Sequence, residues 1–325
     1  MRRGPAPGIS WSRAFAAAFG LAFLVLLLAM QSPRASLREA EAAEQALAGR
    51  ILFGHAGDVW IADNGRLSQL TQGGRYWGEP DWSPDGTRVA LIGWGQNATD
   101  LFVLDPGGEL RQLTRSQQRR LADNDWIHYP RWSPDGELIA YLSDRNSEYA
   151  MLWVMRPDGT NPRQLFNVRS GLSAVDSLTW APDGTKIAVT GFKDSGGQIY
   201  VLDIARPGNL RQVTNEPGGA LDPAWSPDGE YIAYTARDGR NTRIRLIDAD
   251  GRGPATTIVQ GEFPRSPRWS PYGSDLAFIA LAGAEFELFF VPIGLDADGN
   301  HVAGRSTQLT RQFGVDATSA ISWGW

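Results

Sequence analysis

Few residues of this sequence have the types and spacing that catalysis requires. The three histidines, His55, His128 and His301, show no spacing typical of a shared metal ion. Cysteine is absent, which excludes disulfides, thiolate metal sites and a cysteine nucleophile. A Gly-x-Ser-x-Gly nucleophile motif is also absent. We therefore predict a protein that binds rather than catalyses, and we assign no catalytic residue, metal ligand or cofactor.

The residues best suited to contact a ligand gather in three short stretches, 75–79, 123–129 and 262–265. Each stretch combines aromatic, arginine or carboxylate side chains, and Trp, Tyr and Arg tend to dominate binding energy at interfaces. The alternative is that these are ordinary polar loops with a few aromatic plugs. The candidate binding residues are Arg75, Tyr76, Trp77, Asp125, Trp126, His128, Tyr129 and Arg265.

Most of the thirteen tryptophans have another expected role. Six recur at one position of an internal repeat, which predicts packing between repeats rather than a carbohydrate-binding platform. Only Trp77, Trp94 and Trp126 are expected in loops where they could contact a ligand. The six repeat residues are Trp82, Trp132, Trp180, Trp225, Trp269 and Trp323.

The repeat is built on the turn Trp-Ser-Pro-Asp-Gly, which begins at Trp82, Trp132 and Trp225. Variants begin at Trp180 and Trp269, and successive tryptophans are 44 to 50 residues apart, a period typical of stacked or closed repeats. Proline presets φ and the glycine accepts a positive φ, so each copy reverses the chain tightly between two short strands. Three further β-rich segments complete each copy, which predicts four-stranded propeller blades.

The two ends of the repeat array predict how the ring closes. The first copy, beginning near Ile51, lacks its Trp turn, whereas residues 321–325 form a first strand with nothing after it. Placing that strand in the first copy gives a closed all-β fold, a six-bladed propeller without an open edge. An open stack of the same sheets is the alternative.

The runs LWVMRPDGTNPRQL at 152–165 and YPRWSPDGELIAYLSDR at 129–145 resemble blades of the TolB-like propeller family. The resemblance spans about residues 50–325 and implies a periplasmic propeller that binds a lipoprotein partner without performing chemistry. TolB itself carries an α/β domain ahead of its propeller. Because only residues 31–48 separate the hydrophobic segment from the first blade here, the resemblance predicts the fold and not a Tol-Pal role.

A propeller also offers one route to an enzyme. Some six-bladed propellers hold Ca²⁺ in the channel, and Glu79, Asp125 and Asp222 could supply the oxygen ligands that such an ion prefers. The alternative function is therefore a metal-dependent lactonase or lyase-like enzyme at the channel mouth. Convergence of three or more carboxylate or amide oxygens would favour it.

The N-terminal part of the chain predicts a membrane segment. Residues 1–13 are basic, and residues 14–30 are uncharged and about 26 Å long as a helix, the short end of a membrane span. Positive residues before the span place the remainder outside the cytoplasm. We expect an uncleaved anchor, with a cleaved signal and a secreted or periplasmic protein as the alternative. Residues 31–48 are expected to form a helical stalk and residues 49–325 the propeller.

The charge composition excludes one class of binding partner. The net charge is −5, with mixed signs and no basic patch, so nucleic acid is not an expected partner. The sequence as a whole predicts a monomeric, non-catalytic, membrane-anchored propeller outside the cytoplasm that binds a protein or an envelope glycan.

Overall fold

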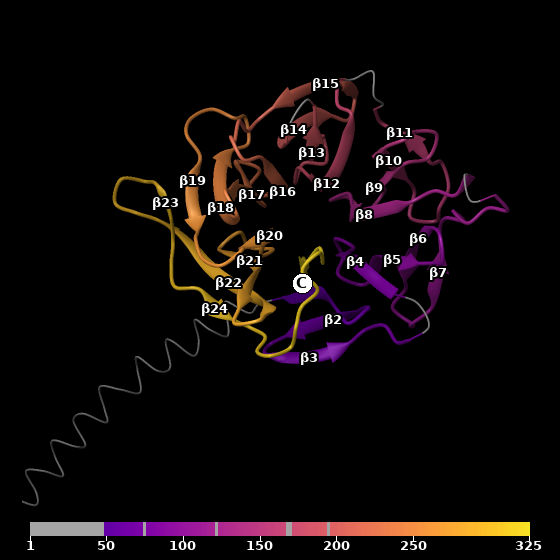
Figure 1. Ribbon diagram of the computed structural model, residues 1–325, viewed down its shortest axis with the longest axis horizontal. Coiled ribbons are helices and arrows are strands. Elements are labelled where there is room, and N and C mark those ends of the chain that lie inside the picture. Colours follow the sequence, from indigo (N-terminus) through magenta and orange to yellow (C-terminus); the bar gives the residue numbers. More distant parts are fainter. Residues whose placement is uncertain (1–48, 74–75, 121–122, 167–170, 194–195) are drawn as a thin grey trace, which may run out of the picture. The chain divides into compact units, whose positions relative to one another are not determined.

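The computed structural model describes residues 49–73, 76–120, 123–166, 171–193 and 196–325. Over these residues six antiparallel sheets are arranged radially around a central channel (Figure 1). The predicted six-bladed, all-β propeller of four-stranded blades is confirmed. The predicted basic segment, membrane segment and stalk at residues 1–48 lie outside the described residues. In the part of the chain that is described, no helix is long and apolar enough to span a membrane.

Each blade runs outward from an inner strand at the channel, and the blades follow one another in chain order. The strands of blades one to three are β25 (Ser322–Gly324), β1 (Arg50–His55), β2 (Asp58–Asp63) and β3 (Arg66–Gln69); β4 (Tyr76–Trp82), β5 (Val89–Trp94), β6 (Thr99–Leu104) and β7 (Leu110–Gln112); and β8 (Ile127–Trp132), β9 (Ile139–Ser143), β10 (Met151–Met155) and β11 (Arg163–Gln164).

Blades four and five are regular, whereas blade six carries an additional short strand, β23, that extends the long strand β22. Their strands are β12 (Ala174–Trp180), β13 (Lys186–Phe192), β14 (Gly197–Asp203) and β15 (Arg206–Gln212); β16 (Ala220–Trp225), β17 (Tyr231–Asp238), β18 (Asn241–Asp248) and β19 (Thr256–Val259); and β20 (Arg265–Trp269), β21 (Asp275–Ala282), β22 (Glu285–Leu295), β23 (His301–Ala303) and β24 (Thr307–Gln308).

The C-terminal strand closes the ring, as the sequence predicts. β25 pairs antiparallel with β1, placing Trp323 opposite Ile51. The inner position of blade one is therefore filled by a segment that follows blade six in sequence. This pairing removes the edge that β1 would otherwise expose.

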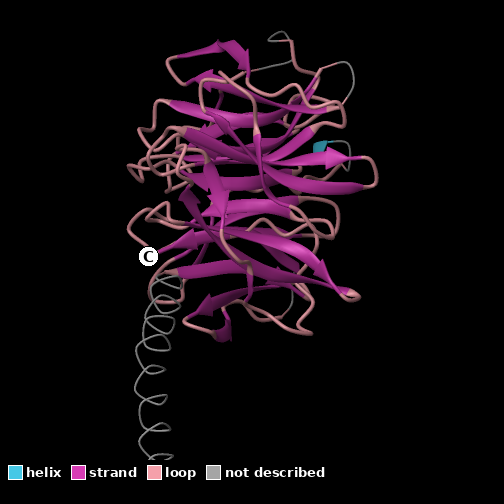
Figure 2. Cartoon of the chain, turned by 90° about the vertical axis from the view of Figure 1, so that its left-hand side faces the viewer, coloured by secondary structure: helices cyan, strands magenta, loops and turns pink. Residues whose placement is uncertain are grey.

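The repeated turns connect the inner strand of each blade to the next strand. In every copy the glycine N–H donates to the carbonyl of the residue three positions earlier, for example Gly86 to Ser83 at 2.8 Å, and Gly86 has a φ of 66°. Prolines of these turns line one mouth of the channel, and the face of the disc at that mouth is here called the turn face. The loops that lead into the inner strands lie at the opposite end of those strands, and their face is here called the loop face; Figure 2 shows loops on both faces of the disc.

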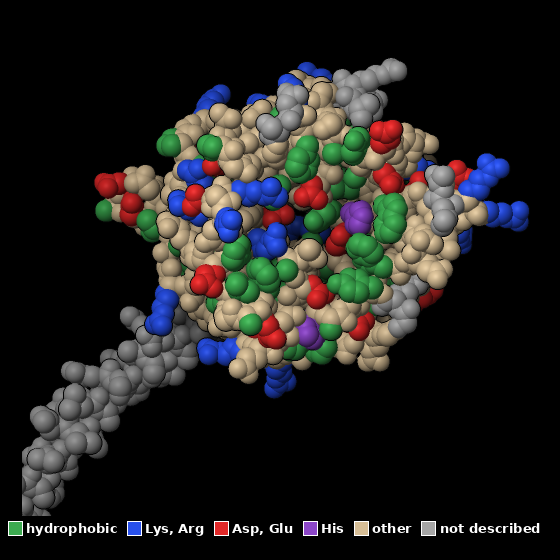
Figure 3. All heavy atoms as spheres, viewed as in Figure 1, with side chains coloured by type: hydrophobic (Ala, Val, Ile, Leu, Met, Phe, Trp, Pro, Cys, Tyr) green, Lys and Arg blue, Asp and Glu red, His purple; other side chains and the backbone are tan. Residues whose placement is uncertain are grey.

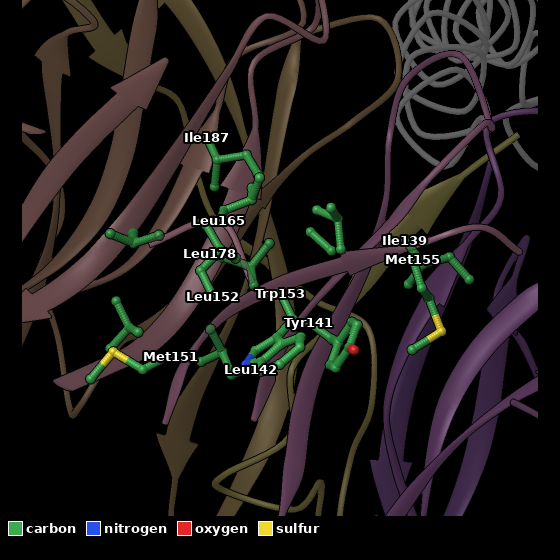
Figure 4. Packing of buried hydrophobic residues seen from close by; sticks show 14 of the residues in the cluster. Ile139, Tyr141, Leu142, Met151, Leu152, Trp153, Met155, Leu165, Leu178 and Ile187 are labelled. Carbon is green, nitrogen blue, oxygen red and sulfur yellow. The ribbon is translucent and has the colours of Figure 1, made fainter. Parts of the chain in front are cut away.

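Apolar side chains fill the spaces between neighbouring blades. Figure 4 shows such packing in one cluster, where Trp153 and Leu152 of β10 lie near Leu178 of β12. The repeat tryptophans reinforce these contacts, because the indole N–H of Trp180 donates to the carbonyl of Arg131 in the preceding blade at 3.0 Å. Trp82 and Trp269 make equivalent bonds to Arg50 and Ala224. The predicted packing role of these tryptophans is confirmed.

Candidate functional site

A bulge interrupts the inner strand of five blades at the same position. In four of them it contains an X-Pro pair, namely Glu79-Pro80, Tyr129-Pro130, Asp222-Pro223 or Ser266-Pro267. Proline cannot donate to a ladder and is tolerated at a bulge, and the residue before it has a φ of 51–53° in all four. Bulges re-aim side chains, and these direct a polar or acidic residue toward the channel.

The bulge side chains also join neighbouring blades. Glu79 accepts the backbone N–H of Tyr129 through Oε2 at 2.6 Å. The Ser177 hydroxyl accepts the N–H of Asp222 at 3.3 Å, and Asp222 accepts the N–H of Ser266 at 3.3 Å. The same carboxylates that face the channel therefore have fixed orientations before any ligand arrives.

Carboxylates dominate the loop-face mouth of the channel. Burial, followed by the charges of Asp222 and Glu79, raises the pKa of Asp176 to about 6. His128 Nδ1 lies 3.2 Å from Glu79 Oε1. Burial lowers the pKa of His128, but the hydrogen bond and charge of Glu79 outweigh it, so that its pKa is raised. The mouth is thus an acidic site that favours a positively charged group.

An aromatic cluster lies beside this acidic mouth, across the boundary between blades two and three. The ring of Trp94 is 5.9 Å from that of Tyr76, 6.1 Å from that of Trp126 and 5.5 Å from that of His128. Tyr76 is 47 % exposed and Trp126 is 37 % exposed. Figure 3 shows hydrophobic, acidic and basic side chains and a histidine around a central hollow on this face.

The loop that carries Trp126 is held in place by its backbone. The N–H of Trp126 donates to Asp144 Oδ1 at 2.7 Å, and Ile127 N–H donates to the Thr99 hydroxyl at 2.5 Å. The exposed indole is therefore presented by a fixed segment. Together with Tyr76, Trp94 and His128 it forms what we call the aromatic cluster.

The structure separates the remaining predicted site residues. Tyr129 lies within β8 and lines the throat of the channel, where burial and the charge of Glu79 raise the pKa of its phenol. Arg265 begins β20 and is half-buried, with its guanidinium 6.0 Å from the ring of Phe286. Arg75 lies outside the described residues.

Three of the predicted positions are wrong. Trp94, which was expected in a loop, is the last residue of β5. Trp77 is not in a loop: it lies in β4, is 6 % exposed and packs edge-on against Phe102 at 5.1 Å, because alternation along the strand turns it into the core. Asp125 does not approach the channel axis, since its carboxylate pairs with Arg145 at 3.7 Å. Asp176, which the sequence analysis missed, joins Glu79 and Asp222 instead.

The three histidines lie apart. The Nδ1–H of His55 donates to the carbonyl of Gly314 at 2.8 Å, and His301 packs against Tyr231 with ring centroids 4.3 Å apart. Among the described residues, no three His, Asp or Glu side chains are grouped so as to hold a metal ion. The oxygen convergence expected of a metal-dependent enzyme is thus not present in this part of the chain.

The throat of the channel carries buried charges that the sequence analysis also missed. Arg131 and Arg268, each directly before a repeat tryptophan, lie below the acidic mouth with Asp81. The cavity on the loop-face side of these arginines has a volume of about 20 Å³, room for about one water molecule. The signal that could have found them is the alternation from the buried tryptophan, which turns the preceding residue toward the axis.

The sequence profile of the TolB beta propeller domain matches residues 124–304, more than half of the chain. The chain belongs to the TolB β-propeller family. The Protein TolB homolog of Chlorobium luteolum is 32 % identical over 193 residues, covering 59 % of this TolB-family chain and 41 % of that protein.

A second relative has a different name. The "Uncharacterized peptidase YuxL" of Bacillus subtilis is 26 % identical over 201 residues, which cover 49 % of this TolB-family propeller and 29 % of YuxL. The chain thus spans less than half the length of both of these relatives. The similarity concerns the propeller, and it does not carry over the activity of either whole protein.

Solved structures show the same TolB-like fold. A putative TolB from Agrobacterium tumefaciens superposes with a TM-score of 0.65 over 85 % of this chain and 98 % of that chain, and TolB from Acinetobacter baumannii with 0.68 over 86 % and 67 %. An oligogalacturonate lyase in complex with manganese gives 0.52 over 74 % and 73 %. Sequence identities of 17–19 % mean that these likenesses show the fold alone.

Proposed function

We propose that this TolB-family propeller is a non-catalytic binding module that holds a protein partner on its loop face, outside the cytoplasm. The observation that carries the proposal is the aromatic cluster around Trp94, exposed beside the acidic channel mouth. Aromatic side chains contribute large contact area at a low entropic cost, and a protein interface needs such anchors near its centre.

The side chains of the loop face indicate which chemical groups a partner would need to complement them. Trp126 and Tyr76 offer apolar area, while Glu79, Asp176 and Asp222 offer negative charge a short way toward the axis. A partner with an apolar or aromatic side chain next to a lysine or arginine would complement both. An envelope glycan could stack on the same rings but would make less use of the carboxylates.

The name of a further relative supports a role beside other proteins. A protein of Anaeromyxobacter dehalogenans called "Tol-Pal system protein TolB" is 32 % identical over 116 residues, which cover 34 % of this chain. We propose a location outside the cytoplasm for this chain, with its uncharged segment 14–30 retained as a membrane anchor and the propeller acting as a monomer. A chain that sediments with membranes and is released by detergent but not by salt would support the anchor. N-terminal sequences that start between residues 31 and 49 would overturn it.

The enzyme alternative has no specific observation in its favour. The lyase structure shares only the fold, and at the loop-face mouth Glu79 is engaged with His128 and the Tyr129 N–H and Asp222 with the Ser266 N–H.

Capture experiments with the detergent-solubilised full-length protein test the proposal. The Trp126→Ala/Tyr76→Ala double variant removes both exposed rings of the aromatic cluster, and Tyr272→Ala removes a ring on the turn face that is 67 % exposed. We expect the parent and Tyr272→Ala to retain the same partner and the double variant to lose it. Equal retention by all three proteins would place the binding surface elsewhere.

A further inference from the structure

The turn-face mouth of the channel is a funnel of about 330 Å³ with an aromatic wall. Prolines of the repeated turns complete the wall, and Trp325 and Tyr272 extend the apolar rim with their rings 4.5 Å apart, edge to face. Six tryptophans line the funnel: Trp132, Trp180, Trp225, Trp269, Trp323 and Trp325.

Two arginines lie at the floor of this funnel with donors that no protein group uses. Arg131 is 4 % exposed, and its Nη1 donates to the Pro130 carbonyl at 2.8 Å. Its Nε is buried without a hydrogen-bond partner among the described residues. Arg268 donates through Nε to the Ile321 carbonyl at 2.7 Å. No hydrogen bond from its two terminal nitrogens to a described residue is present.

Two carboxylates lie near the arginines: Asp81 lines the funnel, and Asp222 lines the cavity on the loop-face side of Arg131 and Arg268. Asp81 Oδ1 is 3.8 Å from Arg131 Nη1, beyond hydrogen-bond distance. Its oxygens instead accept from the Trp132 N–H at 2.9 Å and from the Ser322 hydroxyl at 3.0 Å. Burial, and after it the proximity of Arg131, lowers the pKa of Arg268 to about 9. The floor therefore holds guanidinium donors that no described residue accepts, and those of Arg131 are buried, where an unpaired donor is costly.

We propose that this funnel binds a carboxylate carried on an apolar or aromatic stem, with the carboxylate on Arg131 and Arg268 and the stem against the tryptophan wall. Guanidinium groups offer paired donors that match the two oxygens of a carboxylate. The indole faces and proline rings suit a flat or aliphatic stem better than a highly hydrated one.

The two ends of the channel dictate the direction of approach. On the loop-face side, Glu79, Asp176 and Asp222 repel an anion, and the throat there has room for about one water molecule. Among the described residues that line the funnel from the turn face, Asp81 is the only acidic one. The ligand therefore enters from the turn face and stops at the arginines, at a site separate from the aromatic cluster. A carboxylate on an apolar stem occurs in free organic acids and at the C-terminal residue of peptides.

Calorimetric titration of the full-length protein tests the site with defined probes. The first is 3-phenylpropionate and its matched control is the neutral amide 3-phenylpropionamide. The second is a tripeptide that ends in phenylalanine, with a free or an amidated C-terminus. We expect one equivalent of the free acid to bind and the amide to bind about tenfold or more weakly, because the charge-assisted bonds are lost. Tighter binding of 3-phenylpropionate would indicate a free organic acid as the ligand, and tighter binding of the tripeptide with a free C-terminus would indicate a peptide.

Variants and crystals locate the binding. Arg268→Gln should weaken binding of 3-phenylpropionate about tenfold or more, whereas Arg237→Gln, which removes an exposed arginine outside the funnel, should not change it. Should Arg268→Gln fail to fold, the parent protein soaked with 3-(4-bromophenyl)propionate answers the same question. An anomalous bromine peak within the tryptophan wall is the expected result. Equal binding of acid and amide, no binding of either acid, or a peak elsewhere would overturn the proposal.

Discussion

The carboxylate of Asp81 in β4 accepts the backbone N–H of Trp132 in β8 at 2.9 Å, across the boundary between blades two and three. The same relationship recurs around the channel, where the Ser322 hydroxyl accepts the N–H of Trp82 and the Thr179 hydroxyl that of Trp225. The residue directly before a repeat tryptophan thus ties its blade to the next one. The innermost strands are not hydrogen-bonded to each other as a sheet, so these side chains hold the ring together at its centre.

Removing Asp81 should therefore be costly. Asp81→Ala leaves the Trp132 N–H without its acceptor and Arg131 and Arg268 without their carboxylate, and loss of one partner of a buried charge pair costs about 3–5 kcal/mol. Urea unfolding of the variant should show a correspondingly lower midpoint. Glu109→Ala, which removes an exposed carboxylate, is the control. Equal midpoints for the two variants would mean that Asp81 does not stabilise the ring.

Deletion of residues 319–325 should destabilise the propeller by opening the ring. The deletion removes β25 from β1 and the buried Trp323, and loss of a buried tryptophan alone costs about 3–5 kcal/mol. Deletion of Trp325 alone, which is 51 % exposed, is the matched control. Thermal melts should show a large loss only for the longer deletion. If the two proteins melt together, closure by the C-terminal strand contributes little.

The sequence predicts the repeating parts of this fold and not the channel. Turn chemistry and a fixed spacing from each tryptophan place the strands and the closing pair Ile51 and Trp323, because those features are local. The orientation of Asp125 and Trp77 depends on where a strand begins, and a one-residue difference turns a side chain to the other face. Asp176 reaches the mouth through a bulge, whose side-chain direction depends on pairing with the next strand.

The titration of Asp176 should make the free energy of unfolding depend on pH. Its pKa is raised from the ordinary value to about 6 by burial and by neighbouring carboxylates. The folded state therefore holds this proton more tightly than the unfolded state, so the contribution of Asp176 to stability falls as pH rises from about 4 to about 6. Asp176→Asn, which mimics the protonated form, should be more stable than the parent by about 1–3 kcal/mol at pH 7.5 and equal near pH 3.5.

Chemical unfolding of both proteins at the two pH values measures this difference. Asp228→Asn in an exposed repeated turn is the control and should show no such gain at pH 7.5. A difference between the parent and Asp176→Asn that does not change with pH would show that Asp176 is not the group that titrates.

Two tryptophans six residues apart should separate binding from stability. Trp126 is 37 % exposed, so Trp126→Ala should leave the melting temperature nearly unchanged and weaken the binding of the captured partner. Trp132 is 5 % exposed and lies under the guanidinium of Arg88 at 4.5 Å, so Trp132→Ala should destabilise the fold by about 3–5 kcal/mol. One thermal melt for each variant checks both expectations. If Trp126→Ala unfolds the protein, Trp126 stabilises the fold and its assignment to the binding surface is wrong.

Site-specific photo-crosslinking in living cells tests the central claim that the loop face holds the partner. A photoreactive phenylalanine analogue is placed at position 126 in one full-length protein and at position 272 in another, since Trp126 and Tyr272 are exposed on opposite faces. The account predicts that position 126 cross-links to the captured partner and that position 272 does not cross-link to that same protein. A partner that cross-links from position 272 and not from position 126 would contradict it.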